Sequence, residues 1–210
     1  MNQPAVYPDP KTLTEWRRDY HRHPEIAFEE TRTSQRIAEI LREHGLEPVT
    51  GLGGGTGVVV TIQGNLGTGR SIGLRADIDA LPIEELNDVD YRSSIPGRMH
   101  ACGHDGHTTM LLGAACALAK APDFAGQVHC IFQPAEESEG GGRVMVEEGL
   151  FERFPMDAVY GLHNWPGLAD GEPWPVVQAV TASIGKRSNR PSSTITRPPP
   201  SLSSAGWKIQ

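Results

Sequence analysis

The sequence lacks the features that would direct a chain to a membrane, to nucleic acid or to a disulfide scaffold. No apolar run in its 210 residues approaches the roughly 18 residues that span a bilayer, and residues 1–9 have neither the basic nor the apolar region of a signal peptide. The net charge of −7 argues against nucleic acid or an anionic membrane as the main partner. The three cysteines, Cys102, Cys116 and Cys130, are odd in number and widely spaced, so no disulfide framework is expected. These absences predict a globular protein of the cytoplasm.

One short stretch, in contrast, is rich in side chains that bind metals. Met99–His107 holds His100, Cys102, His104 and His107, and the glycines between them let the backbone bend tightly. Cys102 and His104 offer a thiolate and an imidazole, which suit Zn, Mn or Co. A structural zinc site would need a second Cys or His pair at short spacing, and the sequence has none. The stretch therefore predicts a catalytic metal site with an open position, with a polar surface loop as the alternative.

Hydrophobic periodicity predicts an alternation of helices and strands. We expect helices over 13–21, 31–44, 108–120 and 143–150, and strands over 58–62, 71–74, 127–132 and 158–162. The first two strands are separated by a short connection that contains the glycine-rich residues 64–69, which predicts a strand pair. Another glycine-rich stretch, 51–57, lacks the Lys-Ser/Thr of a phosphate loop and is expected to be a tight connection.

Ionisable side chains follow three of these predicted strands. Asp77 and Asp79 come after the second strand, where an extended chain points both carboxylates to one side. Glu136 and Glu137 follow the third strand, and His163 follows the fourth. Open α/β sheets bind ligands at such strand ends, and one glutamate of a pair can bind metal while its neighbour takes a proton from water. The residues alone therefore predict a metal, a carboxylate base and a site at the strand ends.

Five short motifs made of these residues occur in order along the chain. They are HRHPE at 21–25, RADIDALP at 75–82, HACGHDGH at 100–107, QPAEE at 133–137 and LHN at 162–164. Together they resemble the M20 metallopeptidase/amidohydrolase family, in particular the branch with hippurate hydrolase, N-acyl-amino-acid amidohydrolases and plant auxin-conjugate hydrolases. The resemblance runs from about Leu13 to Gly167. It implies an α/β fold, a zinc-exopeptidase-like three-layer αβα sandwich, of which this chain would hold the catalytic domain only and incompletely.

The resemblance also implies two divalent metal ions per subunit, Zn, Mn or Co, and a set of ligands for them. Cys102 would bridge the two metals, a place that an aspartate holds in other branches. His104 and Glu137 would bind one metal and His163 the other.

Further residues take supporting or catalytic roles in the same resemblance. Glu136 would be the general base, and Asp79 would orient a ligand histidine. Asp77 lies where other branches have a ligand histidine, and its role is left open, while His100 and His107 are expected to be loop or supporting residues. The implied reaction is hydrolysis of the amide bond of an N-acyl amino acid such as hippurate, by a metal-activated water.

The chain also departs from this family. Family members are longer and form homodimers or homotetramers through an inserted dimerisation domain, which we expect to be absent here. They supply a last ligand histidine after that domain, whereas this sequence has no histidine after His163. A second hypothesis is therefore a catalytically dead truncated homologue that binds at most one metal. A third, a hydrolase with Cys102 as nucleophile, is disfavoured because carboxylates surround the thiol as they would around a metal.

Composition divides the chain into residues 1–172 and 173–210. The first part has a net charge of −12, whereas the second has no acidic residue, five basic ones and six of the 17 prolines. A stretch of this kind cannot bury much apolar surface. We expect 1–172 to be the N-terminal part of the catalytic domain and 173–210 to be a disordered basic tail that originates from a frameshifted or truncated gene.

Overall fold

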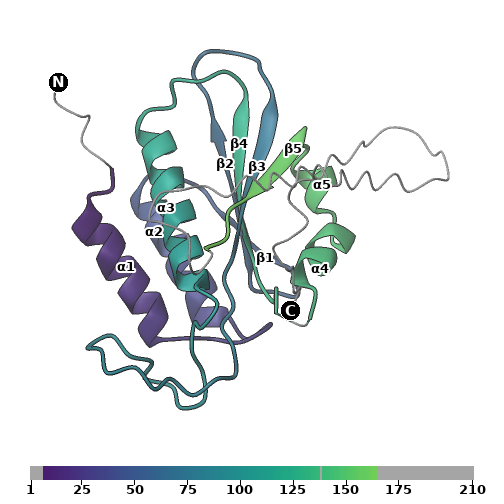
Figure 1. Ribbon diagram of the computed structural model, residues 1–210. Helices are drawn as coiled ribbons and strands as arrows, with labels where there is room; N and C mark the ends of the chain where they lie inside the picture. Colours follow the sequence, from purple (N-terminus) through teal and green to yellow (C-terminus); the bar gives the residue numbers. More distant parts are fainter. Residues whose placement is uncertain (1–6, 138, 165–210) are drawn as a thin grey trace, which may run out of the picture.

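The computed structural model describes residues 7–137 and 139–164, which form one mixed β-sheet between two layers of helices (Figure 1). The elements in chain order are α1 (Pro10–Arg22), α2 (Thr31–Glu43), β1 (Val49–Leu52), β2 (Gly57–Gln63), β3 (Ser71–Asp77), α3 (His104–Lys120), β4 (Gln127–Gln133), α4 (Gly141–Glu147), α5 (Leu150–Arg153) and β5 (Ala158–Gly161). Helices α1, α2 and α3 cover one face of the sheet, and α4 and α5 cover the other. This confirms the expected three-layer αβα architecture, while the proposed tail, 173–210, lies outside the described residues.

The strands are arranged in the order β1-β2-β4-β3-β5. Strand β4 runs parallel to β3, which runs parallel to β5, whereas β2 is antiparallel to both β1 and β4. The expected pairing of 58–62 with 71–74 is therefore wrong, because β4 lies between them. Strand β4 is buried on both faces and takes the central position. The connection from β2 to β3 needs to cross only two strand spacings, about 10 Å, to pass over it.

Other boundaries differ from expectation for local reasons. Helix α3 begins at His104 rather than at 108, so the metal-binding stretch leads directly into its first turn. The predicted helix over 143–150 is divided into α4 and α5 by Gly149, whose φ of +89° breaks the helical path. Strand β1 was not predicted because its four residues, VTGL, are few and include a glycine.

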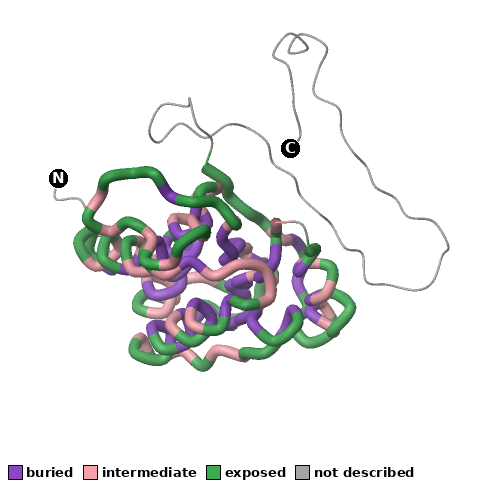
Figure 2. Tube along the Cα trace, turned by 90° about the horizontal axis from the view of Figure 1, so that it is seen from below, coloured by how far each residue is buried: buried purple, intermediate pink, exposed green. Residues whose placement is uncertain are grey.

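Alternate residues of the central strands are buried on opposite faces of the sheet, as the two-residue period of a strand requires. Val58, Val60 and Ile62 belong to the core beneath α1–α3, and Val59 belongs to the core beneath α4 and α5. Figure 2 shows the buried residues gathered in the interior, with exposed residues on the outer turns. Each fully buried aliphatic side chain stabilises the fold by about 1.5–3 kcal/mol. The sheet thus provides a rigid base for residues beyond its strand ends.

Over the described part of the chain, none of the helices combines the length and the apolarity that crossing a membrane demands.

Candidate metal centre

The candidate site lies at one edge of the sheet, beyond the carboxyl ends of three strands. Because β3, β4 and β5 are mutually parallel, the segments that follow them emerge on the same side. Asp77 ends β3, the Glu136-Glu137 pair follows β4, and His163 follows β5. The first turn of α3 packs against this edge and contributes His104.

Six residues in this region form two groups of possible metal ligands that share His104. Within each group, one ligand atom of every residue lies within 4.8 Å of the others. One group contains Cys102, His104 and Glu137, and the other contains Asp77, His104, His107 and His163. The structure therefore brings together all four residues that the sequence predicted as metal ligands.

His104 has the geometry of a metal ligand oriented by a carboxylate. Its side chain is fully buried, and Nδ1 lies 2.9 Å from the backbone oxygen of Asp79 and 3.2 Å from Asp79 Oδ1. These acceptors place the hydrogen on Nδ1, so the lone pair of Nε2 points into the site. Nε2 is buried and has no hydrogen-bond partner among the described residues. A buried nitrogen without a partner is costly, and a cation bound to it would remove that cost.

The electrostatics of the site also favour a cation. Burial alone would lower the pKa of His104, but the hydrogen bond with Asp79 and the charge of Asp77 outweigh it and raise that pKa. Burial raises the pKa of the Cys102 thiol to about 12, and the neighbouring Glu137 adds to the effect. The contributions of the neighbouring carboxylates to both shifts indicate a negative potential, which attracts a divalent metal. A bound metal deprotonates a coordinating thiol. The residues present therefore fit a metal.

Asp79 connects two of the candidate ligands. Its Oδ1 accepts from His104, and its Oδ2 accepts from the backbone N–H of Glu137 at 2.9 Å. One buried carboxylate thus fixes both the ring orientation of His104 and the position of the chain at Glu137. This is the arrangement expected of a group that orients metal ligands.

Cys102 and His163 face each other across the site. Their Sγ and Nε2 atoms are 3.4 Å apart. His163 donates from Nδ1 to the backbone oxygen of Asn164 at 2.7 Å, which leaves the Nε2 lone pair directed toward the thiol. His163 is exposed, so it lies on the open side of the site.

The sequence left open the role of Asp77 and predicted His107 as a loop or supporting residue, and the structure places both beside the ligands. His107 donates from Nδ1 to Asp77 Oδ1 at 2.6 Å, and its Nε2 accepts the backbone N–H of Asn164 at 3.0 Å. Burial would raise the pKa of Asp77, but the bond with His107 and the charge of Arg75 lower it to about 2. With both ring nitrogens engaged, His107 ties α3 to the residue after His163. The signal in the sequence was its spacing of three from His104, which places both on one helix face.

Glu136 and Asp105 are the neighbours of two candidate ligands. Glu136 is exposed in the turn after β4, next to Glu137, and its charge acts on the pKa values of Cys102 and His104. Asp105 is buried beside His104 and accepts from His21 Nδ1 at 2.8 Å and from Arg17 Nε at 2.9 Å. His21, from the HRHPE motif, thus fastens α1 to the start of α3.

His100, by contrast, is not placed as a ligand. It is buried, and neither of its ring nitrogens has a hydrogen-bond partner among the described residues. Burial lowers its pKa to about 4, so the ring is neutral near pH 7.

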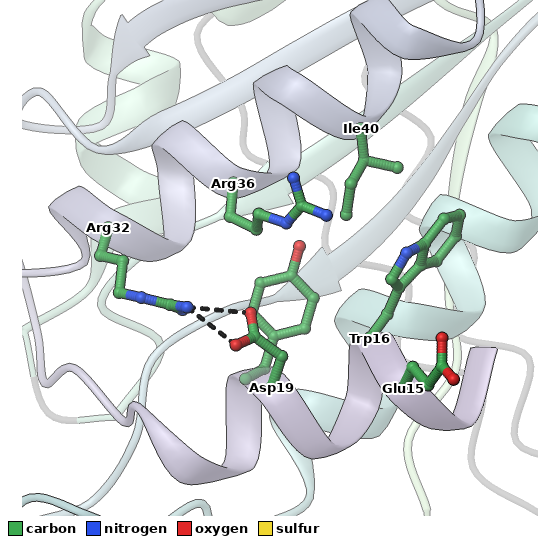
Figure 3. Close-up of a pocket in the computed structure, with 7 residues that line it drawn as sticks. Glu15, Trp16, Asp19, Arg32, Arg36 and Ile40 are labelled. Atoms are coloured by element: carbon green, nitrogen blue, oxygen red, sulfur yellow. Dashed lines mark hydrogen bonds and ion pairs between the residues drawn. The ribbon is translucent and has the colours of Figure 1, made fainter. Parts of the chain in front are cut away.

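A separate cavity of about 300 Å³ lies between α1 and α2 and contains none of these residues (Figure 3). Its arginines already have partners. Arg32 binds both carboxylate oxygens of Asp19, at 2.8 and 3.0 Å, and Arg36 binds Glu39 at 3.1 Å. Because these charges are compensated within the chain, the arginines described in the cavity offer no free charge to a ligand, and the site at the strand ends is the functional candidate.

Comparisons with known proteins match this geometry. The sequence profile of peptidase family M20/M25/M40 matches residues 73–205, more than half of the chain. Hippurate hydrolase of Campylobacter jejuni is 48% identical over 155 residues, which cover 73% of this chain and 39% of that protein. Thermostable carboxypeptidase 2 of Saccharolobus solfataricus is 45% identical over 162 residues, covering 74% and 40%. A crystal structure of a dinuclear metal binding peptidase of the M20 family from Bacillus subtilis has a TM-score of 0.71 at 41% identity, covering 75% of this chain and 44% of that one.

The chain spans about 40% of the length of these curated relatives. The profile match extends beyond residue 167, so it does not support the expected end of the resemblance there. It includes four of the five motifs, from RADIDALP to LHN. The profile match, the relatives above 40% identity and the shared fold together show that the chain belongs to peptidase family M20/M25/M40.

Proposed function

We propose that this chain carries the metal site of a metal-dependent amidohydrolase that cleaves the amide bond of N-acyl amino acids. The observation that carries the proposal is His104, whose unpartnered Nε2 converges with Cys102 and Glu137 while Asp79 orients its other nitrogen. Cys102, His104, Glu137 and His163 would hold the metal ions. When bound, divalent metals polarise a carbonyl oxygen and lower the pKa of water.

Glu136 acts as the general base in this proposal. It follows β4 beside the candidate ligand Glu137, and it is exposed, so water can reach its carboxylate. The carboxylate takes a proton from the attacking water and passes it to the leaving amine, a role that contributes about 10²–10⁴-fold to the rate. Asp79 holds the His104 ring and the Glu137 backbone in place beside Glu136.

The substrate class follows from what two relatives have in common. Hippurate is an N-acyl glycine, and a carboxypeptidase cleaves the bond before a C-terminal residue. In both, the scissile amide joins an acyl group to an amino acid with a free carboxylate. We therefore expect N-benzoyl and N-acetyl amino acids to be the simplest substrates.

The test combines metal analysis with hydrolysis of a panel of N-acyl amino acids by the purified chain. We expect bound divalent metal, turnover that EDTA abolishes, and at least 100-fold slower turnover with unchanged metal content in Glu136→Gln. Glu139→Gln, an exposed neighbour outside the site, is the matched control and should retain activity. At most one bound metal without turnover would instead support the catalytically dead homologue, and activity that survives EDTA would support a thiol hydrolase.

A further inference from the structure

Glu30 is a fully buried carboxylate with an unusual position at the start of α2. It precedes the first helical residue but does not cap its own helix. Its Oε1 instead accepts the backbone N–H of Ala135 at 2.8 Å, and its Oε2 accepts the hydroxyl of Thr56 at 2.7 Å. Burying an ionisable group costs free energy unless its oxygens are hydrogen-bonded. Both oxygens are satisfied here, by residues far away in the sequence.

Ala135, the residue that Glu30 contacts, has a strained backbone. Its φ is +50°, a left-handed conformation that costs a residue with a Cβ about 1–2 kcal/mol. The strain persists only because the surroundings hold it. The Ala135 N–H donates to Glu30, and the Ala135 oxygen accepts from Gly141 N at 2.8 Å. A Cβ on Gly141 would lie 1.9 Å from the backbone oxygen of Pro134. The start of α4 therefore packs against the backbone before Ala135 too closely for any side chain at position 141.

We propose that Glu30 is a positioning residue for the Glu136-Glu137 pair, because it locks the strained Ala135 that immediately precedes it. Glu30 holds the amide before the pair, and Asp79 holds the amide of Glu137 within it. Glu136 therefore projects from a segment that is fastened on both sides. The proposal rests on the roles assigned to Glu136 and Glu137 above and adds a third carboxylate, 106 positions before Glu136 in the sequence, that sets their geometry.

The contacts of Glu30 indicate that its length matters more than its charge. Among the described residues it forms no ion pair, and both of its partners are neutral donors. A glutamine has the same length, its oxygen can accept from Ala135, and its NH₂ can donate to the Thr56 hydroxyl, which also accepts. An aspartate keeps the charge but is one methylene shorter, about 1.5 Å, and cannot reach both partners.

The experiment therefore compares Glu30→Gln with Glu30→Asp in the full chain. The first readout is hydrogen exchange of the Ala135 amide measured by NMR. We expect at least tenfold faster exchange in Glu30→Asp and exchange within twofold of the unchanged chain in Glu30→Gln. The amide of Ile131, in the centre of β4, monitors general loosening and should stay protected in both variants.

The second readout is the affinity for Co²⁺, followed by its visible spectrum. Glu30→Asp should bind Co²⁺ about 10-fold more weakly, in the range seen when residues that orient metal ligands are changed, and Glu30→Gln should restore the affinity. If the chain also turns over substrate, kcat should fall in Glu30→Asp with little change in KM. Exchange and cobalt binding do not need turnover, so they decide the proposal even if the amidohydrolase assignment fails.

Glu148→Ala is the control for the neighbouring turn. Glu148 accepts from the amides of Gly53 and Gly54 at 2.6 and 3.0 Å and steadies the turn that carries Thr56. The Ala135 N–H donates to Glu30 and not to Glu148. This variant should leave cobalt affinity unchanged. Wild-type exchange of the Ala135 amide in Glu30→Asp would overturn the proposal. Equal losses in Glu30→Asp and Glu30→Gln would also overturn it, because Glu30→Gln keeps the side-chain length that the proposal makes decisive.

Discussion

The candidate site depends on residues that orient other groups as much as on the ligands themselves. Asp79 binds His104 and the Glu137 amide, Glu30 binds the Ala135 amide, and Asp77 binds His107. All three of these carboxylates are buried, so their hydrogen bonds face little competition from water. A small change in any of them should therefore act through geometry, without removing a ligand.

Asp79→Asn tests this at the residue with two contacts. The amide oxygen can accept from one partner, but its NH₂ cannot accept from the other. Either the Glu137 amide loses its hydrogen bond, or His104 loses its bond to the side chain and keeps only the one to the Asp79 backbone oxygen. We expect Zn²⁺ or Co²⁺ affinity to fall about 10–100-fold in a competition titration. Asp157→Asn is the control, since Asp157 accepts from Ser71 N, outside the metal centre. An unchanged affinity in Asp79→Asn would show that the carboxylate does not orient the ligands.

At the scale of elements, the sequence predicted the site better than the sheet. The sequence places the ligand residues at strand ends because both the length of a strand and the polar residues that end it can be recognised from neighbouring residues. The order of strands is not local, and the chain gave no sign that β4 would separate β2 from β3. For the same reason, the sequence predicted His107 only as a loop or supporting residue and assigned no role to Glu30. Their partners are Asp77 and Ala135, which are 30 and 105 positions away in the sequence.

Strand β4 also carries a titratable group that should make stability depend on pH. His129 is buried beside Phe154 and lies opposite Thr61 in β2, with its Nδ1 2.8 Å from the Thr61 hydroxyl. Burial lowers the pKa of His129 below its ordinary value of 6.5. As the pH falls below 6.5, the unfolded chain binds a proton that the folded chain refuses, so acid favours unfolding. The stabilisation is present above pH 6.5 and is lost on acidification toward the folded pKa.

His129→Gln removes this titration while keeping a polar partner for Thr61. The free energy of unfolding, measured by urea denaturation of the metal-free chain, should decrease less between pH 7 and pH 5 in this variant than in the unchanged chain. Thr61→Val is the control, because it removes the hydroxyl but leaves the titrating ring, and should lower stability while retaining the pH slope. Parallel pH profiles for His129→Gln and the unchanged chain would contradict the assignment.

At the scale of the whole molecule, the candidate metals would join several segments of the chain at the edge of the sheet. Their proposed ligands come from the stretch before α3, from the first turn of α3 and from the segments after β4 and β5. The helical layers are held by their own apolar cores, on opposite faces. A metal bound at the edge would therefore add stability to a sheet that already has its core. The chain should fold without the metal, so the stability that the metal adds can be measured by itself.

Thermal unfolding with and without metal measures that contribution. A ligand that binds only the folded chain stabilises it by about 2.7 kcal/mol at 100 times its Kd, which for this size corresponds to about 5–10 °C in Tm. We expect Tm to rise by this order on adding Zn²⁺ or Mn²⁺ and to return on adding EDTA. His163→Ala should keep the metal-free Tm, because its side chain is exposed, and lose most of the metal-dependent increase. Leu162→Ala, the exposed neighbour, should keep both values.

Two outcomes of this experiment would contradict the assignment. If His163→Ala retained the full metal-dependent increase in Tm, His163 would not be a ligand. If the unchanged chain melted at the same temperature with metal and with EDTA, the edge of the sheet would not be a metal centre.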